Sequence, residues 1–470
     1  MQLRVFRHFI PLSILLLASS DALLIAAAFY ALLLYSGIET AIVPGITGFS
    51  AQLSAGLSFA SVTAMLFLGV YGQQSFVDLR LWFSKIAAAS LLVLLLVSFS
   101  ATYWRDILDH LTDFAHFPLK ATLIWLACVS VTRGAFSVTF GRGLLKRRVL
   151  VLGNGTQAAR IARLVESRQN EHFIPVSFID LSAETTGVHT HVPVWCGSEE
   201  ADGLMALSSR LEASEIVVAA DDRRGLPVQQ LLHCKLGGIK VTDFLDFWER
   251  ETRTVDLDAL RPSWLFFSDG FRCGPVDEFL KRIFDILVSS TLLVLTLPLL
   301  LLTACLIKLD SPGPVLYRQA RVGLHGRVFT ILKFRSMRVD AETDGRPRWA
   351  AKGDPRVTRV GAIIRKLRID ELAQILNVLR GDMSFVGPRP ERPYFVAELA
   401  RAIPYYTERH WVRPGITGWA QINFPYGAST EDARRKLSYD LYYVKNRSIF
   451  LDALILLQTA RVVLWNQGAR

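Results

Sequence analysis

The sequence predicts a membrane protein of mixed class, in which α-helical parts are joined to an α/β part. Long apolar stretches fill the first third of the chain, short strands alternate with helices in the middle, and a further apolar run opens a polar C-terminal region. Of the 470 residues 51% are hydrophobic and 20% are charged. The two shares are compatible because the apolar residues are concentrated in segments. The predicted domains are a four-helix transmembrane domain at 1–145, a parallel α/β domain at 146–250, a linker at 251–276 and a C-terminal domain at 277–470.

Four apolar stretches near the N-terminus are each long enough to cross a bilayer, which takes about 20 residues in a helix. They lie at 9–35, 53–71, 86–103 and 118–140. The first is too long for the apolar core of a cleavable signal peptide and has no obvious small-residue cleavage site. We therefore interpret it as a signal anchor.

Basic residues gather at alternate ends of these spans, and this predicts their orientation because cytoplasmic flanks are rich in lysine and arginine. The residues are Arg4 and Arg7 before the first span, Arg80 and Lys85 between the second and third, and Arg133, Arg142, Lys146, Arg147 and Arg148 at or after the end of the fourth. Both ends of the four-helix unit should therefore face the cytoplasm, and so should the chain that follows it.

The formal net charge of +11 favours an anionic partner such as a lipid surface or a nucleotide. Nucleic acid is not expected, because the basic residues flank membrane segments and form no polybasic arm or aromatic-interleaved motif. The five cysteines have no paired spacing, which argues against a zinc site and a disulfide framework and fits a reducing cytoplasm.

The middle segment carries a nucleotide-binding signature. Residues 149–153 form an apolar strand that ends in Gly153, and Gly155 follows just before a predicted helix. A Gly-x-Gly-x-x-Ala turn in this place is the fingerprint of a Rossmann-like domain, so Gly153 and Gly155 are candidates for binding the phosphates of a nucleotide cofactor. Asp180, however, lies beyond the ~20 residues usual for the ribose-binding acid. A regulatory or structural Rossmann-like domain is the favoured interpretation, with a bound dinucleotide as the alternative.

A fifth apolar run at 283–307 has two interpretations. Its length and composition are those of a transmembrane helix. However, Lys281 and Lys308 place positive charge on both flanks, and Pro298 removes a backbone hydrogen bond and bends the helix. The run is either a kinked fifth span or a bent helix that enters the membrane and returns on the same side.

Phosphate-binding residue types recur in the blocks that follow, at 333–337, 365–372, 381–390 and 413–421. Asp370 and Glu371 stand at the start of an apolar-periodic helix. Such a pair often only caps the helix and complements its dipole. The chemical interpretation is that Arg365 and Arg368 gather phosphate there, while one carboxylate attacks phosphorus and the other holds a hard cation such as Mg²⁺.

The Gly387-Pro388-Arg389-Pro390 segment is a stiff turn that fixes one guanidinium. Arginine at such a position suits planar recognition of phosphate oxygens. Alone the turn is compatible with a structural role. Together with the other basic blocks it favours a phosphate cradle.

These blocks resemble, closely and in the same order, those of the polyprenyl-phosphate sugar phosphotransferases, the monotopic phosphoglycosyl transferases of bacterial exopolysaccharide assembly. The resemblance covers about 279–467. It rests on Lys-Arg-Ile-Phe-Asp at 281–285, Lys-Phe-Arg-Ser-Met at 333–337, Asp-Glu-Leu at 370–372, Gly-Asp-Met-Ser-Phe-Val-Gly-Pro-Arg-Pro at 381–390, Arg-Pro-Gly-Ile-Thr-Gly-Trp-Ala-Gln at 413–421 and Asp-Leu-Tyr-Tyr-Val-Lys-Asn at 440–446.

The resemblance implies a ping-pong reaction in which Asp370 attacks the β-phosphate of a UDP-sugar, UMP leaves, and polyprenyl phosphate accepts the sugar phosphate. It implies that Glu371 is the Mg²⁺ ligand. It suggests that further residues bind phosphate or organise the site, namely Lys333, Arg335, Arg365, Arg389 and Asp440. The long members of this family also suggest a homodimer.

The resemblance further implies a re-entrant helix at 279–308 and a catalytic domain on the cytoplasmic face of the bacterial inner membrane. This chain has Leu297-Pro298 where the family often has Ser-Pro, so Thr296 is the expected partner for the carbonyl groups freed at the bend. Residues 449–465 are short and contain Asp452 and Arg461, which favours an interfacial helix over a span. Tyr442 and Tyr443 are either headgroup-level or core aromatic residues.

Two other functions are compatible with parts of the sequence. A membrane-tethered nucleotide-sugar-modifying enzyme of the dehydratase or epimerase type needs a Tyr-x-x-x-Lys pair, and no tyrosine here has a lysine four residues later. A nucleotide-sensing membrane scaffold would explain the first half of the chain but not the clustered acidic and basic blocks of the second. The sequence leaves the transferred sugar open.

Overall fold

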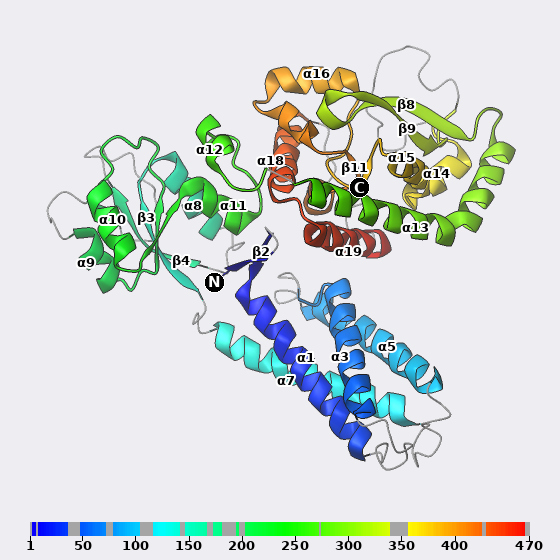
Figure 1. Cartoon of the computed structure of the whole chain (residues 1–470), viewed down its shortest axis with the longest axis horizontal. Helices are drawn as coiled ribbons and strands as arrows, with labels where there is room; N and C mark the ends of the chain where they lie inside the picture. The colour runs from blue at the N-terminus through cyan, green and yellow to red at the C-terminus, as the bar shows by residue number, and fades with distance from the viewer. Residues whose placement is uncertain are drawn as a thin grey trace.

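The computed structural model of the chain describes residues 2–5, 8–35, 48–71, 79–103, 116–141, 146–166, 173–180, 194–196, 203–271, 274–338, 356–424 and 429–465. Two of the basic residues used to predict orientation, Arg7 and Arg142, lie outside these ranges. The predicted fold class is confirmed. A bundle of apolar helices, a parallel α/β layer and a mixed C-terminal domain follow one another along the chain (Figure 1).

Four N-terminal helices form the membrane domain. They are α1 (Leu12–Tyr35), α3 (Phe49–Leu68), α5 (Leu79–Tyr103) and α7 (Phe117–Gly141). Each is long and apolar enough to cross a bilayer, and Figure 1 shows them side by side in one bundle, from blue to cyan. A short hairpin of β1 (Gln2–Val5) and β2 (His8–Pro11) precedes them.

The bundle encloses a polar contact between α1 and α7. Asp21 is fully buried, and its carboxylate lies 3.1 Å from the Arg133 guanidinium and accepts hydrogen bonds from Tyr71 at 2.7 Å and Thr132 at 2.5 Å. The sequence placed Arg133 among the charges flanking the fourth span, and this is corrected: its side chain lies inside the bundle as the partner of a carboxylate. Such a pair locks two helices together, because separating it leaves a buried charge unpaired.

The middle domain is a parallel five-stranded sheet in the order β5-β4-β3-β6-β7. The strands are β3 (Arg147–Leu152), β4 (Phe173–Asp180), β5 (Val194–Cys196), β6 (Glu215–Val218) and β7 (Lys240–Asp243). The helices are α8 (Thr156–Glu166), α9 (Gly203–Arg210), α10 (Val228–Leu236) and α11 (Phe244–Thr252). Separate apolar clusters pack on the two faces of the sheet, so the central strand β3 is buried on both sides.

The predicted linker at 251–276 packs closely against the C-terminal domain. Val255 and Leu260 are buried in the same apolar core as Leu441, and the Val255 backbone N–H donates to the Ser438 carbonyl at 3.0 Å. The segment contains α12 (Pro262–Phe267). Just before it, Glu249 on α11 forms a buried ion pair with Lys445 at 2.5 Å. The middle and C-terminal domains are therefore joined by a continuous packed interface.

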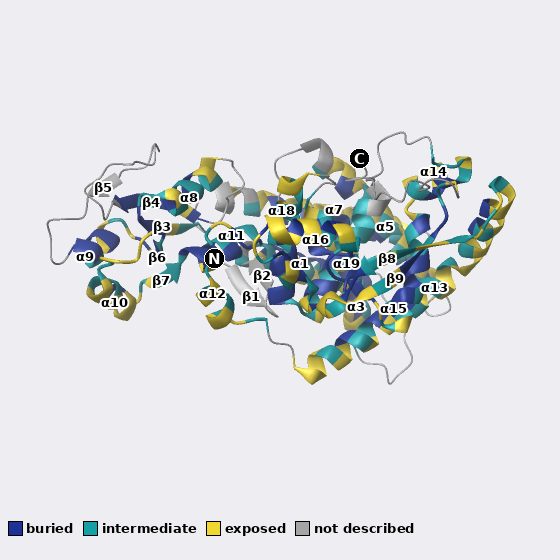
Figure 2. Ribbon diagram, turned by 90° about the horizontal axis from the view of Figure 1, so that it is seen from above, coloured by how far each residue is buried: buried dark blue, intermediate teal, exposed yellow. Residues whose placement is uncertain are grey.

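The fifth apolar run lies in α13 (Pro275–Asp310), with Pro298 inside it. Figure 1 shows α13 changing direction along its length. Much of its apolar surface is exposed (Figure 2), including Val294 at 71% and Leu295 at 73%, as is usual for a lipid-facing helix. Pro298 has no N–H group to donate to the Val294 carbonyl, which is therefore freed. The Thr296 hydroxyl donates instead to the Leu292 carbonyl, at 2.7 Å. Thr296 is thus not the partner of the freed carbonyl that the sequence led us to expect.

The C-terminal domain packs short elements against one side of α13. They are the antiparallel hairpin β8 (Leu316–Val322) and β9 (Val328–Phe334), with the 3₁₀ turn η2 (Leu324–Gly326) between them, then α14 (Arg359–Lys366), η3 (Ile369–Gln374), α15 (Ile375–Arg380), β10 (Ser384–Val386), α16 (Pro393–Ala402), η4 (Tyr406–Trp411), β11 (Gly415–Thr417), α17 (Trp419–Asn423), α18 (Thr430–Asn446) and α19 (Ile449–Trp465). Tyr442 and Tyr443 on α18 are almost fully buried, so they are core residues.

Buried polar groups join α13 to this domain. Lys281 lies 3.1 Å from Asp285, one turn along the helix, and 2.7 Å from Asp452 on α19. Asp285 in turn accepts hydrogen bonds from Ser384 and from the Phe385 backbone at the start of β10, both at 3.1 Å. The Lys-Arg-Ile-Phe-Asp block therefore attaches the apolar helix to the strand that leads into the Gly-Pro-Arg-Pro turn.

Candidate active site

The Asp-Glu pair lies on η3, a single 3₁₀ segment after α14. Arg368 precedes it with a positive φ of 58°, which ends α14 and turns the chain so that η3 runs along β9. Arg368, and not Asp370, takes the N-cap position, and no side chain caps the segment. The structural interpretation of Asp370 as a helix cap therefore does not apply.

Three cations surround Glu371. Its Oε1 atom lies 3.0 Å from Lys333 Nζ and 2.5 Å from an Arg389 guanidinium nitrogen, and Oε2 lies 3.9 Å from Arg368. Burial by itself raises the pKa of Glu371, but Arg389 and Lys333 outweigh it and hold that pKa well below its usual range. Glu371 is therefore ionised at neutral pH.

Asp370 has different surroundings. Its side chain is 9% exposed, and within the described part of the chain its carboxylate forms no hydrogen bond or ion pair. Burial and the neighbouring charge of Glu371 raise its pKa, while Lys333, Arg365 and Arg389 act more weakly in the opposite direction. An oxygen nucleophile needs unoccupied lone pairs, and it needs positive charge nearby that binds the group it attacks. The surroundings of Asp370 provide both.

Lys333 is held beside η3 by a residue that the sequence analysis missed. Asn377 on α15 is fully buried, accepts a hydrogen bond from the Leu332 backbone N–H at 2.9 Å and donates to the Thr330 carbonyl at 2.8 Å. These bonds fix the position of β9 against the helix that follows the Asp-Glu pair. An asparagine between Leu376 and Val378 on an apolar helix gave no sequence signal of this role.

Arg389 lies on a turn formed by two glycine-containing motifs packed backbone to backbone. Strands β10 and β11 pair in parallel, the Gly387 N–H donates to the Thr417 carbonyl at 2.9 Å, and the Gly415 N–H donates to the Pro388 carbonyl at 3.0 Å. A Cβ atom on Gly415 would lie 2.1 Å from the Gly387 nitrogen. Only glycine permits this approach, which explains why both motifs have it.

Asp440 is connected to the site through Arg409. It is buried on α18, and its carboxylate accepts a hydrogen bond from Arg409 at 2.7 Å. The same Arg409 nitrogen donates to the Arg389 carbonyl at 3.0 Å. Asp440 belongs to one of the recognised sequence blocks, whereas Arg409 belongs to none and could not be found from them.

Two further candidate residues take different positions. Arg335 is 5% exposed and donates to the Ser311 carbonyl at 2.6 Å and the Pro312 carbonyl at 2.9 Å. It therefore closes the C-terminal end of α13, where a cation is favoured, and does not contact Glu371. Arg365 is in the last turn of α14, close enough for its charge to act on Asp370.

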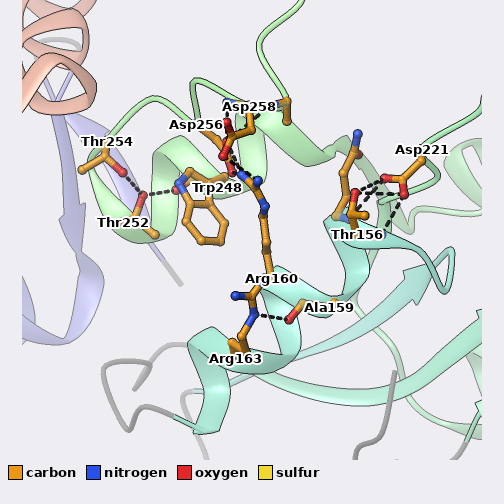
Figure 3. Close-up of polar contacts among 12 residues, drawn as sticks. Thr156, Ala159, Arg160, Arg163, Asp221, Trp248, Thr252, Thr254, Asp256 and Asp258 are labelled. Atoms are coloured by element: carbon orange, nitrogen blue, oxygen red, sulfur yellow. Dashed lines mark hydrogen bonds and ion pairs between the residues drawn. The ribbon is translucent and has the colours of Figure 1, made fainter. Parts of the chain in front are cut away.

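The structure places Gly153 and Gly155 at the turn before α8, as the fingerprint predicts. Gly153 has a φ of 130° and lies against the backbone of Ala219. The first turn of α8, however, is already capped by Asp221, whose carboxylate accepts hydrogen bonds from the Thr156 N–H at 2.7 Å and the Gln157 N–H at 3.2 Å (Figure 3). These are the donors that a dinucleotide phosphate would use.

The candidate site offers oxygen ligands suited to Mg²⁺. Within the described ranges no group of three or more histidine, cysteine, aspartate or glutamate side chains gathers. Mg²⁺ is nevertheless commonly bound by one or two carboxylates together with substrate phosphates. Asp370 and Glu371 are adjacent carboxylates, and Glu371 is ionised, as a ligand must be. The donor set therefore fits Mg²⁺ in the company of a phosphorylated substrate.

Comparison with protein families gives a match of 276–466 to the model of the bacterial sugar transferases. Curated relatives include a UDP-N-acetylgalactosamine-undecaprenyl-phosphate N-acetylgalactosaminephosphotransferase of Aeromonas hydrophila, 48% identical over 250 residues that make up 53% of this chain and 58% of the relative. An undecaprenyl-phosphate glucose phosphotransferase of Komagataeibacter xylinus is 34% identical over 69% of this chain and 60% of its own length.

A third relative is matched over more of its length. The UDP-glucose:undecaprenyl-phosphate glucose-1-phosphate transferase of Escherichia coli (strain K12) is 33% identical over 361 residues, which make up 73% of this chain and 74% of the relative. The chain thus spans less than two thirds of the first two relatives and about three quarters of the third. The family match begins within one residue of α13 and covers every residue of the candidate active site.

Proposed function

This chain belongs to the bacterial sugar transferase family, and on that premise we propose that it transfers a sugar 1-phosphate from a UDP-sugar to undecaprenyl phosphate. The product, a polyprenyl diphosphate sugar, is the lipid-linked primer on which an exopolysaccharide or an O-antigen type of glycan is assembled. The observation that carries the proposal is the carboxylate of Asp370, which has no ion pair among the described residues, beside the cations that hold Glu371.

We propose that the reaction proceeds in two displacements at one phosphorus atom. An Asp370 carboxylate oxygen attacks the β-phosphorus of the UDP-sugar, the bond from that phosphorus to the bridging oxygen breaks, and UMP leaves. A phosphate oxygen of undecaprenyl phosphate then attacks the same phosphorus, and the bond to Asp370 breaks, which restores the carboxylate. Covalent catalysis of this kind replaces one difficult step by two easier ones.

The positive groups around the pair suit this chemistry. Lys333, Arg365 and Arg389 each lie close enough to Asp370 for their charges to lower its pKa. Cations placed where charge develops in the transition state stabilise phosphoryl transfer strongly in a site that excludes water. Arginine adds planar recognition of phosphate oxygens. We propose that these three residues bind the diphosphate of the donor.

We propose that Mg²⁺ is the metal ion of the reaction and that Glu371 holds it, with Asp370 adjacent. When bound, Mg²⁺ would neutralise negative charge on the diphosphate. Until then Lys333 and Arg389 neutralise Glu371. With Mg²⁺ held by Glu371, part of the charge of these two residues would be available to bind the substrate.

N-acetylgalactosamine is the first sugar to test. The Aeromonas hydrophila relative, which is 48% identical over 250 residues, has a name that specifies that sugar. A panel of UDP-N-acetylgalactosamine, UDP-N-acetylglucosamine, UDP-glucose and UDP-galactose distinguishes the candidates.

The proposed placement is multi-pass in a bacterial inner membrane, with the catalytic domain on the cytoplasmic face, where nucleotide sugars are available, and with the chain as a homodimer. The re-entrant interpretation of α13 fits this placement because it leaves the site on the same side as the end of α7. Cysteine labelling at the two ends of α13, at Val276 and Leu309, in intact and permeabilised cells tests it. Periplasmic labelling at Leu309, which a kinked fifth span requires, would contradict it.

The direct test incubates the purified full chain with undecaprenyl phosphate, Mg²⁺ and each UDP-sugar, and measures UMP. We expect release with one sugar and none from Asp370→Asn. With donor labelled in the β-phosphate and no acceptor, the label should remain on the wild-type protein, and mass spectrometry should locate it at Asp370. Unchanged UMP release by the variant would rule out the covalent route.

A further inference from the structure

Arg409 is a buried cation that is connected to the candidate site through one residue, Arg389. It is on η4, with 6% of its side chain exposed. Its guanidinium donates to the Asp440 carboxylate at 2.7 Å, to the Tyr406 hydroxyl at 2.8 Å and to the Arg389 backbone carbonyl at 3.0 Å. Nothing places Arg409 in contact with Asp370 or Glu371 within the described residues.

We propose that Arg409 is a positioning residue of the sugar-phosphate transfer, which holds the backbone of Arg389 so that the Arg389 guanidinium remains on Glu371. This inference rests on the proposed function of the site. It adds a residue outside the recognised sequence blocks and gives Asp440 a specific task, which is to neutralise and orient Arg409.

The sequence of the turn explains why Arg389 needs this contact. Arg389 stands between Pro388 and Pro390, and neither proline has a backbone N–H group. The turn can therefore be fixed mainly through its carbonyl groups. Each of three successive carbonyls has a donor from a different element: the Gly415 N–H at 3.0 Å for Pro388, Arg409 for Arg389, and Arg321 at 3.1 Å for Pro390.

The side chain that contacts the Arg389 carbonyl, Arg409, is charged although it is buried. Burying a guanidinium is unfavourable unless it is paired and hydrogen-bonded, and an apolar side chain usually serves packing equally well. Arg409 meets that requirement with Asp440 on α18 and Tyr406 one turn away. One terminal nitrogen of the guanidinium donates to both the Asp440 carboxylate and the Arg389 carbonyl, while the other donates to Tyr406. A lysine ends in a single nitrogen, so it lacks the second donor group that Tyr406 holds in place and cannot reproduce this rigid arrangement. The arrangement therefore favours backbone positioning over packing.

A double-mutant cycle tests the proposal. Arg409→Lys should keep the charge opposite Asp440 but lower kcat/KM for UMP release about tenfold, mostly through kcat, because Arg389 is misplaced on Glu371. In an Arg389→Lys background, which has already lost the forked contact, the same Arg409→Lys change should cost less than about twofold. Asp440→Asn should behave like Arg409→Lys in both backgrounds.

The matched control is Arg250→Lys. Arg250 is another buried arginine, paired with Glu215 at 2.9 Å in the middle domain and distant in sequence from the turn. If Arg250→Lys lowers activity through general stability, it should lower kcat/KM by the same factor in the wild-type and the Arg389→Lys backgrounds. Melting curves of every variant show whether the folded fraction has changed. Equal losses for Arg409→Lys in both backgrounds, or full activity of Arg409→Lys, would overturn the positioning role. Absence of UMP release by the wild-type chain would instead overturn the proposed function on which it rests.

Discussion

Asp370 and Glu371 are adjacent in the chain, yet Glu371 lies 3.0 Å from Lys333 and 2.5 Å from Arg389, while Asp370 has no ion pair within the described residues. Their pKa values consequently move in opposite directions, upward for Asp370 and downward for Glu371. Two carboxylates whose surroundings separate their pKa values take different roles. This asymmetry supports the assignment of the first as nucleophile and the second as metal ligand.

The first prediction concerns stability. The pKa of Asp370 is raised in the folded state, so the unfolded chain binds fewer protons between the ordinary and the raised value, and folding stability falls as pH rises through that window. Asp370→Asn removes this cost. In EDTA its melting temperature should exceed that of the wild type by about 2 °C at pH 7.5 and by less at pH 4. A lower melting temperature at pH 7.5 would contradict the unpaired state of Asp370.

The second prediction concerns Lys333. The pKa of Glu371 is depressed, so its ionisation stabilises the fold above the ordinary glutamate range, and this contribution is lost as pH falls through the depressed value. Lys333→Met removes one of the two close cations, so the variant should lose stability mainly above pH 5 and lose activity at least tenfold. The variant Lys333→Met/Glu371→Gln should recover stability but not activity, as measured by thermal unfolding and UMP release.

The third prediction concerns Asn377. Asn377→Leu is similar in size but leaves the Leu332 N–H and the Thr330 carbonyl buried without partners, which should cost about 2–4 kcal/mol of unfolding free energy. Asn423→Leu is the control, because Asn423 is exposed and, among the described residues, donates to Trp419 in its own short helix. Similar stability of the two variants in urea would show that Asn377 does not hold β9.

The fourth prediction concerns the packed turn. Gly415→Ala would place a methyl group 2.1 Å from the Gly387 nitrogen and 2.4 Å from the Thr417 carbonyl oxygen, so β10 and β11 must separate and Arg389 must move. We expect loss of most activity. Gly274→Ala is the control, since its new Cβ would meet nothing closer than 3.9 Å at an ordinary φ of −73°. An active Gly415→Ala enzyme would mean that the close approach is not required.

The fifth prediction concerns the middle domain. Asp221 already occupies the N–H groups at the start of α8, so a second anion there would meet its negative charge. NAD⁺ at 1 mM (roughly a typical cofactor-saturating level) should leave the wild-type melting temperature unchanged, while Asp221→Ala should lose about 1 kcal/mol, as expected for a lost helix cap. A rise in melting temperature with NAD⁺ would show that the fingerprint binds a nucleotide.

The sequence predicted the order and class of the three domains because the signals are local. Apolar length identified the membrane helices, strand and helix alternation identified the α/β layer, and Pro298 indicated the bend in α13. The motifs also led to the Asp-Glu pair, although a local pattern could not show that Arg368, and not Asp370, takes the N-cap position.

Other features depended on contacts between distant segments. Arg133 looked like a flanking charge until the bundle placed it on Asp21, 112 residues away. The position of Asp221 could have been predicted. It follows β6, which is the neighbour of β3, and the carboxyl ends of parallel strands meet at the same edge of a sheet. Arg409 carried none, because an arginine outside any motif does not reveal which backbone carbonyl it will meet.

The sequence by itself determined the architecture and the residue types that the chemistry needs, because hydrophobic periodicity, proline and glycine act on their immediate neighbours. Only the tertiary structure decided which charge acts on which. It placed Lys333 and Arg389 on Glu371, gave Asp370 no ion pair among the residues that the structure describes, and assigned Arg335 to the end of α13. The physical reason is that electrostatic interaction and desolvation depend on distance and burial in space, and these are set by packing between segments that lie far apart in the chain.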